Sequence, residues 1–471
     1  MKKNKLLTII LFSLIFFISV AYAAEIILSK EVSFDNGNTN LKATNVQDAL
    51  EELYSKAKSE KSCSANVAEP VLKDDLIPVK ISDNGTVTYA DTNKSWYDYC
   101  DKIWANAVIL NDGVSYNVGD TIKESDIQSY FVWIPKYKYK LWNVDTASKT
   151  AHEIDIIFDT KDTTDISGVS CKTPMTSGSS GNCKNGEYMT HPAFISMGVN
   201  GFWAGKFETG YKGATSATAA QVNSSDSSKI IVKPNSYSWR NLTVMNMFTA
   251  TYNYKRTMNS HMMKNTEWGA VAYLSHSKYG INREININNN SSFKTGYSAS
   301  LETDQHTYLG VYGDGGSYNH MYNDDIGYLS NTTGNISGIY DMSGGTHEYM
   351  ASYISGQLGS SGFTSTTIQN YDSKYFDIYN ANSSTKSYKN RILGDATGEM
   401  GPFKEYKDGD NSVSRNHNSW YESLSNFATQ TYQWFTRGGR NTYGILAGQF
   451  NFDASNGTAG VAISFRIVLS P

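Results

Sequence analysis

The hydrophobic pattern changes character along the chain. An unbroken apolar run covers residues 6–20, and residues 44–54 then repeat apolar positions at helical spacing. From Tyr130 onward the apolar stretches are short, and glycine turns and Ser/Thr/Asn-rich loops separate them. This pattern predicts an α+β protein with many short strands and few helices.

The N-terminus carries the features of an export signal. Lysines at 2, 3 and 5 precede the apolar run, and Ala21-Tyr22-Ala23 follows it as a small-x-small cleavage site. We therefore predict a signal peptide over residues 1–23 and a secreted or cell-surface protein with no membrane span after cleavage. The alternative is an uncleaved anchor, because the run approaches the shortest length that spans a bilayer.

Residues 24–58 are expected to form a strand, at 25–34, and then an amphipathic helix. Thr44 and Gln47 have the spacing of a capping box. One helix face carries Val46, Ala49, Leu50 and Leu53. So short a helix is marginal alone, so its apolar face must pack on the following domain or on other copies of the chain. Because residues 32–53 resemble a stretch that precedes the heads of trimeric phage tail fibres, we expect self-association as a homotrimer.

The rest of the chain divides by composition. Residues 59–75 are polar and predict a linker, and residues 76–128 predict a small β-rich module. In this module Asp83-Asn84-Gly85 marks a hairpin turn. The last region, 129–471, starts with an expected strand at 130–135. It also holds two expected helices, within 239–254 and 266–275.

Charge and cysteine content narrow the function class. The 471 residues include 41 Lys+Arg and 45 Asp+Glu, a net charge of −4, which argues against nucleic-acid binding. Four cysteines in an exported chain favour structural disulfides. Cys63/Cys100 and Cys171/Cys183 are the nearest pairs in one of three possible connectivities, and the sequence leaves all three open. The sequence contains neither the CxxC nor the HExxH spacing that would suggest a metal site.

Several motifs in order carry a family resemblance. They are Gly201–Glu208, Asn265–Ala270, Gly338–Tyr349, Arg437–Gly439 and Ser464–Arg466. Together they resemble the formylglycine-generating-enzyme, or sulfatase-modifying-factor, family, whose domain is a variant of the C-type lectin fold. The resemblance covers about residues 129–469. It implies a C-type lectin-like domain, although a fold by itself implies no chemistry.

The catalytic part of the family pattern is missing. The generating enzymes hold copper with two cysteines in the C-terminal region and oxidise a target cysteine, yet residues 437–471 contain no cysteine. We therefore expect a non-catalytic protein without a catalytic cofactor. His347 and Glu348 are a poor acid–base pair, because neighbours on a strand point to opposite faces. The alternative is an enzyme of the copper-dependent, cysteine-oxidising type.

The resemblance also implies a structural calcium ion. Its ligands would be the Asp341 side chain and the backbone carbonyls of Met342, Gly344 and Thr346. Oxygen ligands of this kind suit Ca²⁺. The alternative is that Asp341 only caps the turn.

The C-terminal loops are the predicted ligand-binding face. Ala447–Phe452 alternates like a core strand, and Phe452 and Phe465 are expected in the core. The chain resembles family members whose loops here are rewritten by diversity-generating retroelements, although ordinary exposed loops would look similar. The predicted ligand-binding residues are Arg440, Asn441, Thr442, Tyr443, Ile445, Leu446, Asp453, Ser455, Asn456 and Thr458. Tyr and Asn suit adaptable recognition of a protein or glycan, and a purely structural surface-fibre subunit is a further alternative.

Overall fold

A computed structural model describes residues 32–33, 41–60, 67–73, 75–159, 169–171, 176–299, 320–380, 388–402 and 418–471. The chain divides into two compact units, Met1–Ala65 and Asn66–Pro471. The described part is a mixed α+β structure, rich in strands, with five helices and several antiparallel sheets, which confirms this level of the prediction. The predicted signal peptide and most of the predicted strand at 25–34 lie outside the described residues.

The first unit contains helix α2, Val46–Glu60, and confirms the predicted helix. Its cap is one residue later than predicted. Asn45, not Thr44, precedes the helix, accepting from Asp48 N at 2.8 Å and donating to the Asp48 carboxylate at 2.7 Å. Asparagine caps a helix at least as well as threonine does, and the Val46 N–H is already bonded to the Val32 carbonyl.

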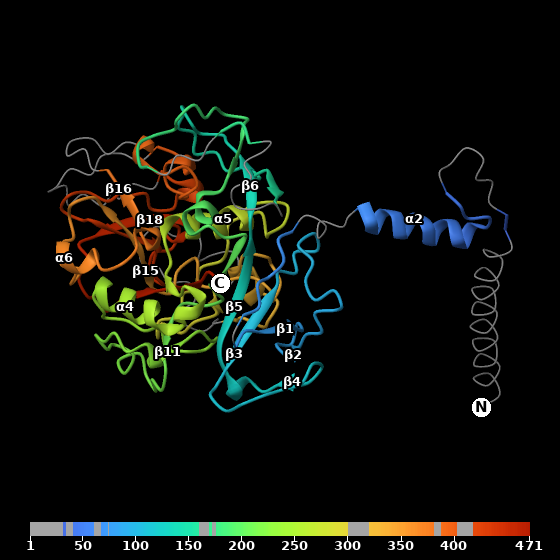
Figure 1. The fold of residues 1–471 in the computed structure, drawn as a ribbon, viewed down its shortest axis with the longest axis horizontal. Helices are drawn as coiled ribbons and strands as arrows, with labels where there is room; N and C mark the ends of the chain where they lie inside the picture. The colour runs from blue at the N-terminus through green and yellow to red at the C-terminus, as the bar shows by residue number, and fades with distance from the viewer. Residues whose placement is uncertain are drawn as a thin grey trace, which may run out of the picture. The chain divides into compact units, whose positions relative to one another are not determined.

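An antiparallel eight-stranded sheet organises the second unit. Its strands, in spatial order, are β12 (His261–Met262), β20 (Ile467–Leu469), β9 (Gly201–Gly205), β5 (Ile127–Pro135), β3 (Asn106–Leu110), β1 (Ile77–Ile81), β2 (Val87–Tyr89) and β4 (Thr121–Ile122). β5 lies beside β3, and β3 in turn lies beside β1 (Figure 1). Phe131, Val132, Trp133 and Ile134 on β5 are all fully buried, so both faces of this strand are covered.

Residues 76–128, predicted as a small module, contribute β1 to β4 to this same sheet. The predicted hairpin is present, since β1 pairs with β2 around Asp83–Gly85. Part of the predicted linker also packs on the sheet. The indole N–H of Trp133 donates to the Ala68 carbonyl at 2.9 Å, and that of Trp203 donates to the Val71 carbonyl at 2.8 Å.

A second, five-stranded sheet carries the C-terminal motifs. Its strands are β16 (Asp377–Tyr379), β15 (His347–Ile354), β17 (Trp434–Gly438), β18 (Gly448–Ser455) and β19 (Ile463–Phe465). β15 pairs in parallel with β16 and β19 and antiparallel with β17. β18 contains the predicted strand at 447–452, apart from its first residue, and Phe452 and Phe465 are fully buried as expected.

Three small sheets complete the strands. They comprise β7 (Ile156–Phe158), β6 (Tyr137–Lys140) and β8 (Tyr188–Thr190); β10 (Gly210–Tyr211) and β11 (Ile230–Ile231); and β13 (Tyr297–Ser298) and β14 (His320–Met321). The remaining helices are α3 (Pro192–Met197), α4 (Val244–Tyr254), α5 (Asn265–Ser275) and α6 (Ser365–Ile368). Short 3₁₀ turns occupy Glu124–Asp126, Ser227–Lys229, Arg256–Met258, Gly327–Ser330, Ser373–Tyr375, Tyr388–Asn390, Gly398–Met400 and Trp420–Glu422.

Both predicted helices of the large region are present. α4 starts later than the pattern suggested, because Thr243 caps it by accepting from Asn246 N. α5 is buried on every side. Gly269 on α5 has no room for a side chain, since a Cβ there would lie 1.9 Å from the Gly394 carbonyl oxygen.

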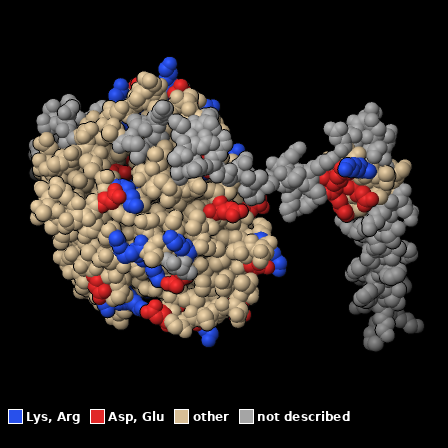
Figure 2. Space-filling model, viewed as in Figure 1, with Lys and Arg blue, Asp and Glu red and all other residues tan. Residues whose placement is uncertain are grey.

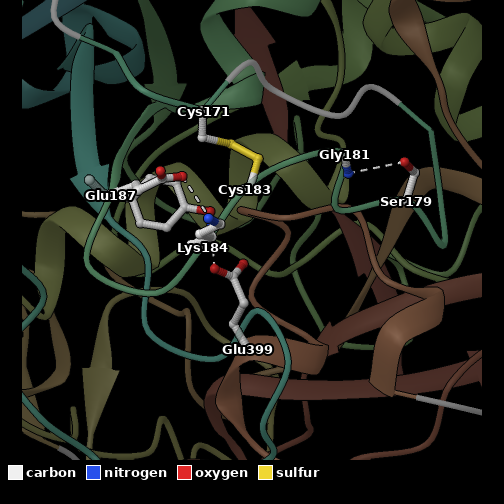
Figure 3. Close-up of a disulfide and its surroundings, with 8 residues drawn as sticks. Cys171, Ser179, Gly181, Cys183, Lys184, Glu187 and Glu399 are labelled. Atoms are coloured by element: carbon white, nitrogen blue, oxygen red, sulfur yellow. Dashed lines mark hydrogen bonds between the residues drawn. A yellow bond between two sulfur atoms is a disulfide. The ribbon is translucent and has the colours of Figure 1, made fainter.

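Cys171 and Cys183 form a buried disulfide (Figure 3). This pairing agrees with one bond of the nearest-neighbour connectivity. Cys100 is also disulfide-bonded, whereas Cys63 lies outside the described residues. On the face drawn in Figure 2, basic and acidic side chains lie interspersed instead of forming a field of one sign.

Candidate functional site

Three of the motifs that carry the resemblance meet at Arg466. Its guanidinium donates to both oxygens of Glu348, at 3.0 and 2.5 Å. It also donates to the carbonyls of Gly205 at 2.9 Å and Tyr340 at 3.0 Å. Arg466 and Glu348 have no exposed side-chain surface. Arg466 therefore ties β9, β15 and the turn before β15 to the end of β19.

The other two motifs meet around Trp268 of α5. Its indole N–H donates to the Gln449 carbonyl at 2.7 Å, and the Arg437 guanidinium lies 5.6 Å from its ring. Arg437, fully buried, donates to the Ala396 carbonyl at 2.9 Å. These residues hold α5 against the second sheet, so their observed contacts are structural.

Asp341 is buried and surrounded by N–H donors. Its carboxylate accepts from Gly296 N at 2.8 Å, from Asn288 Nδ2 at 2.8 Å and from Glu208 N at 3.3 Å. Burial raises the pKa of Asp341, and Arg466 opposes this shift. In this structure Asp341 therefore bonds the surrounding backbone, as the capping alternative expects, and the calcium site formed with Met342, Gly344 and Thr346 stays a prediction.

His347 and Glu348, which the sequence made a poor acid–base pair, contact different neighbours. Glu348 accepts both bonds from Arg466, whereas the His347 ring packs edge-on against Tyr443, with ring centroids 4.7 Å apart. This is the alternation expected along a strand. His347 joins the two C-terminal loops, because its N–H also donates to the Ala462 carbonyl at 3.0 Å.

The first loop, residues 439–447, is less exposed than predicted. Asn441 and Tyr443 are 5% and 7% exposed, and Leu446 is fully buried. The expectation that these three side chains face solvent is therefore wrong. Tyr443 and Leu446 pack in a cluster with Ile287, Ala299, Leu424 and Ala447. Gly439 brings the loop in tightly, because its φ is +75° and a Cβ there would lie 2.8 Å from Ala447 Cα.

Arg440, Thr442 and Ile445 are the half-buried members of the first loop. Ile445 packs against the apolar cluster. The Arg440 guanidinium lies over the Tyr443 ring, 5.2 Å from its centroid. Together with the backbone of Gly444, they are the parts of the first loop that reach the surface.

The second loop runs from the end of β18 to β19, over residues 456–462. Ser455 at its start contacts the Tyr349 hydroxyl at 2.5 Å, and that hydroxyl donates to the Thr458 carbonyl at 3.0 Å. Asn456 Oδ1 accepts from Thr458 N at 3.1 Å. Thr458 is exposed, and Val461 is 57% exposed.

Apart from Asp453, the predicted ligand-binding residues thus fall into two groups. Those from Arg440 to Leu446 lie on the first loop, and Ser455, Asn456 and Thr458 lie around Tyr349. Asp453, half-buried on β18, accepts from Asn426 Nδ2 at 2.7 Å. Val461 was not predicted as a contact residue, although its place in the loop was a usable signal.

A buried acid that the sequence analysis missed lies away from these loops. Glu399 accepts from the hydroxyls of Tyr139 at 3.0 Å and Tyr273 at 2.8 Å, and from Gly394 N at 2.5 Å. Burial raises its pKa to about 7. The partners lie far apart in sequence, so no local pattern could have shown this network.

The described residues contain no group of three or more His, Cys, Asp or Glu side chains placed to hold a metal ion. In the same part of the chain, no helix has both the length and the apolar character needed to cross a bilayer. Comparison with protein-family models gave no match, and neither did comparison with curated proteins.

Proposed function

We propose that the chain is an exported, non-catalytic binding protein whose domain, over residues 129–471, is a formylglycine-enzyme-like variant of the C-type lectin fold. Its ligand-binding face is the loop pair 439–447 and 456–462. The observation that carries the proposal is that the motif residues and the loop pair differ in burial. The motif residues are buried in mutual contacts, whereas the loop pair keeps polar and apolar side chains at the surface.

The lectin-like assignment is supported by how the motifs are used. Motifs more than 100 residues apart, such as those of Glu348 and Arg466, meet in direct contacts. In a shared scaffold, residues that define the family are expected to hold the fold, leaving the loops free to vary. Diversification of these loops by a retroelement follows from the same resemblance, and a neighbouring reverse transcriptase gene with a template repeat of the final codons would test it.

The rival function is copper-dependent cysteine oxidation. The chain has no cysteine after Cys183. The test compares copper content, conversion of a cysteine-bearing sulfatase peptide, and binding to arrays of glycans and extracellular protein domains. We expect no stoichiometric copper, no conversion above the blank, and binding. Conversion of the peptide would overturn the proposal.

For the first unit we propose self-association through α2, most simply as a trimer. Ala49 is buried, yet Leu50 and Leu53 on the same helix are 58% and 49% exposed. A helix of 15 residues with such a face gains stability by packing that face against other copies. Trimerisation would multiply the avidity of the loop pair for a surface ligand.

A further inference from the structure

Among the residues that the structure describes, the half-buried cation Arg440 has no acceptor for its guanidinium. Its Nε atom is buried and has no hydrogen-bond partner in the described part of the chain. Within the described residues, no ion pair or side-chain hydrogen bond involves its guanidinium, which rests on Tyr443 at 5.2 Å. Leaving a buried donor unpaired costs free energy unless a partner arrives.

Other buried arginines of this domain place their terminal guanidinium nitrogens on acceptors, although the Nε atoms of Arg437 and Arg391 are also unpartnered among the described residues. Arg466 pairs with Glu348, and Arg437 donates to the Ala396 carbonyl. Those guanidiniums have their acceptors within the fold. Arg440 differs because it lies on a ligand-facing loop, where the missing acceptor can come from outside.

Arg440 is the charged residue of the first loop, residues 439–447. Next to it in the chain, Asn441 turns inward: it is 5% exposed, and its Nδ2 donates to the Asn290 carbonyl at 3.0 Å. A guanidinium is matched by a carboxylate, to which it can donate two parallel bonds. A Glu or Asp side chain of a protein offers such a carboxylate.

We propose that Arg440 binds a Glu or Asp carboxylate on a protein ligand. The inference rests on the proposed function and names its ligand class. A protein is favoured over a glycan because the Tyr443 ring, already packed by Arg440 and His347, offers no free face on which a sugar could stack. The exposed apolar side chain of the second loop, Val461, is aliphatic and suits a protein side chain.

The test uses the full chain on an array of peptides, each acidic peptide paired with a twin in which Gln replaces Glu. Sialylated glycans and their desialylated forms share the array. We expect preference for acidic peptides over their twins, and a loss of about 10- to 100-fold in Arg440→Gln, the range for a charge-assisted hydrogen bond. The affinity of Arg440→Lys should lie between those of the parent and Arg440→Gln, because lysine keeps the charge but lacks the planar guanidinium.

The matched control is Arg256→Gln. Arg256 also stacks on a tyrosine, 3.6 Å from the centroid of Tyr252, but is exposed and outside the loop pair. It should bind like the parent. Equal binding of acidic peptides and twins, an unchanged Arg440→Gln variant, or binding to sialylated glycans alone would overturn the inference. If Val461→Asp abolishes binding while Arg440→Gln does not, the inference fails and the proposed function stands; if neither changes binding, the proposed function fails as well.

Discussion

Arg466, the residue between strands β19 and β20, forms a fully buried bidentate ion pair with Glu348 of β15, although 118 positions separate them in sequence. Removing one member leaves the other charge buried and unpaired. We predict that Glu348→Leu lowers the free energy of unfolding by about 3–5 kcal/mol, whereas Glu348→Leu combined with Arg466→Met recovers much of the loss. Urea unfolding measures both.

The control for this pair is an exposed one. Lys255 and Asp75 lie 2.6 Å apart, but the Asp75 side chain is 68% exposed. Asp75→Asn should cost no more than about 1 kcal/mol. Equal losses in Glu348→Leu and Asp75→Asn would contradict the assignment of Arg466 as the centre of the scaffold.

Tyr443 is predicted to stabilise the fold, in contrast to the expectation from sequence. Because its ring is 7% exposed and packed in the apolar cluster, Tyr443→Ala should destabilise the domain by about 3–5 kcal/mol. Tyr432→Ala is the matched control, since Tyr432 is 41% exposed and should shift stability by no more than about 0.5 kcal/mol. A parent-like melting temperature for Tyr443→Ala would return this ring to the list of ligand contacts.

The contrast between Tyr443 and Phe452 shows where sequence reasoning works. Phe452 lies in an alternating run, so its burial on β18 follows from a period of two. Tyr443 lies among glycines with positive φ, Gly439 at +75° and Gly444 at +52°, and a turn of that kind sets the side-chain direction by its backbone. No periodic pattern reports that direction.

Contacts between residues far apart in the sequence could not be predicted from local patterns either. The helix at α5 was predictable from its spacing, but the approach of Gly269 to Gly394 depends on how distant segments pack. The residues before β1 looked like a linker because they are polar, yet the carbonyls of Ala68 and Val71 are held by two tryptophans. Local composition reports solvent preference and does not report backbone hydrogen bonding.

Glu399 should make stability depend on pH. Burial raises its pKa from 4.5 to about 7, so the fold favours the protonated form. The stabilisation of the fold by protonated Glu399 is fully present below about pH 4.5 and is lost as the pH rises through about 7. Glu399→Gln cannot ionise. The stability of the parent relative to this variant should therefore fall across that window and stay constant above it, as urea unfolding from pH 4 to 8 would show.

The exposed Glu69→Gln serves as the control and should follow the parent at every pH. A parent whose stability relative to Glu399→Gln rises between pH 4.5 and 7 would contradict the buried, protonated state of Glu399.

If copies of the chain associate through the exposed apolar face of α2, a charge on that face should lower the mass of the assembly. Leu50 is 58% exposed, and Leu50→Glu places a charge where copies would pack. Light scattering should show a trimer for the parent and a monomer for the variant. Val118→Glu, at a position in the second unit that is 57% exposed, should leave the trimer intact. A monomeric parent, or an unchanged mass for Leu50→Glu, would remove the assembly role of the first unit.

The most direct test of the central claim compares two valines. Val461 on the second loop and Val118, outside the loop pair, are both 57% exposed, so Val461→Asp and Val118→Asp make the same chemical change at equal exposure. Both variants should keep the parent's melting temperature, since exposed substitutions shift stability by about 0.5 kcal/mol or less. On the arrays of glycans and extracellular protein domains, we predict that Val461→Asp loses about 10-fold or more in affinity, as expected when a contact residue worth more than about 1 kcal/mol is lost, while Val118→Asp binds like the parent. Parent-like binding by Val461→Asp, or an equal loss in both variants, would contradict the loop pair as the binding face.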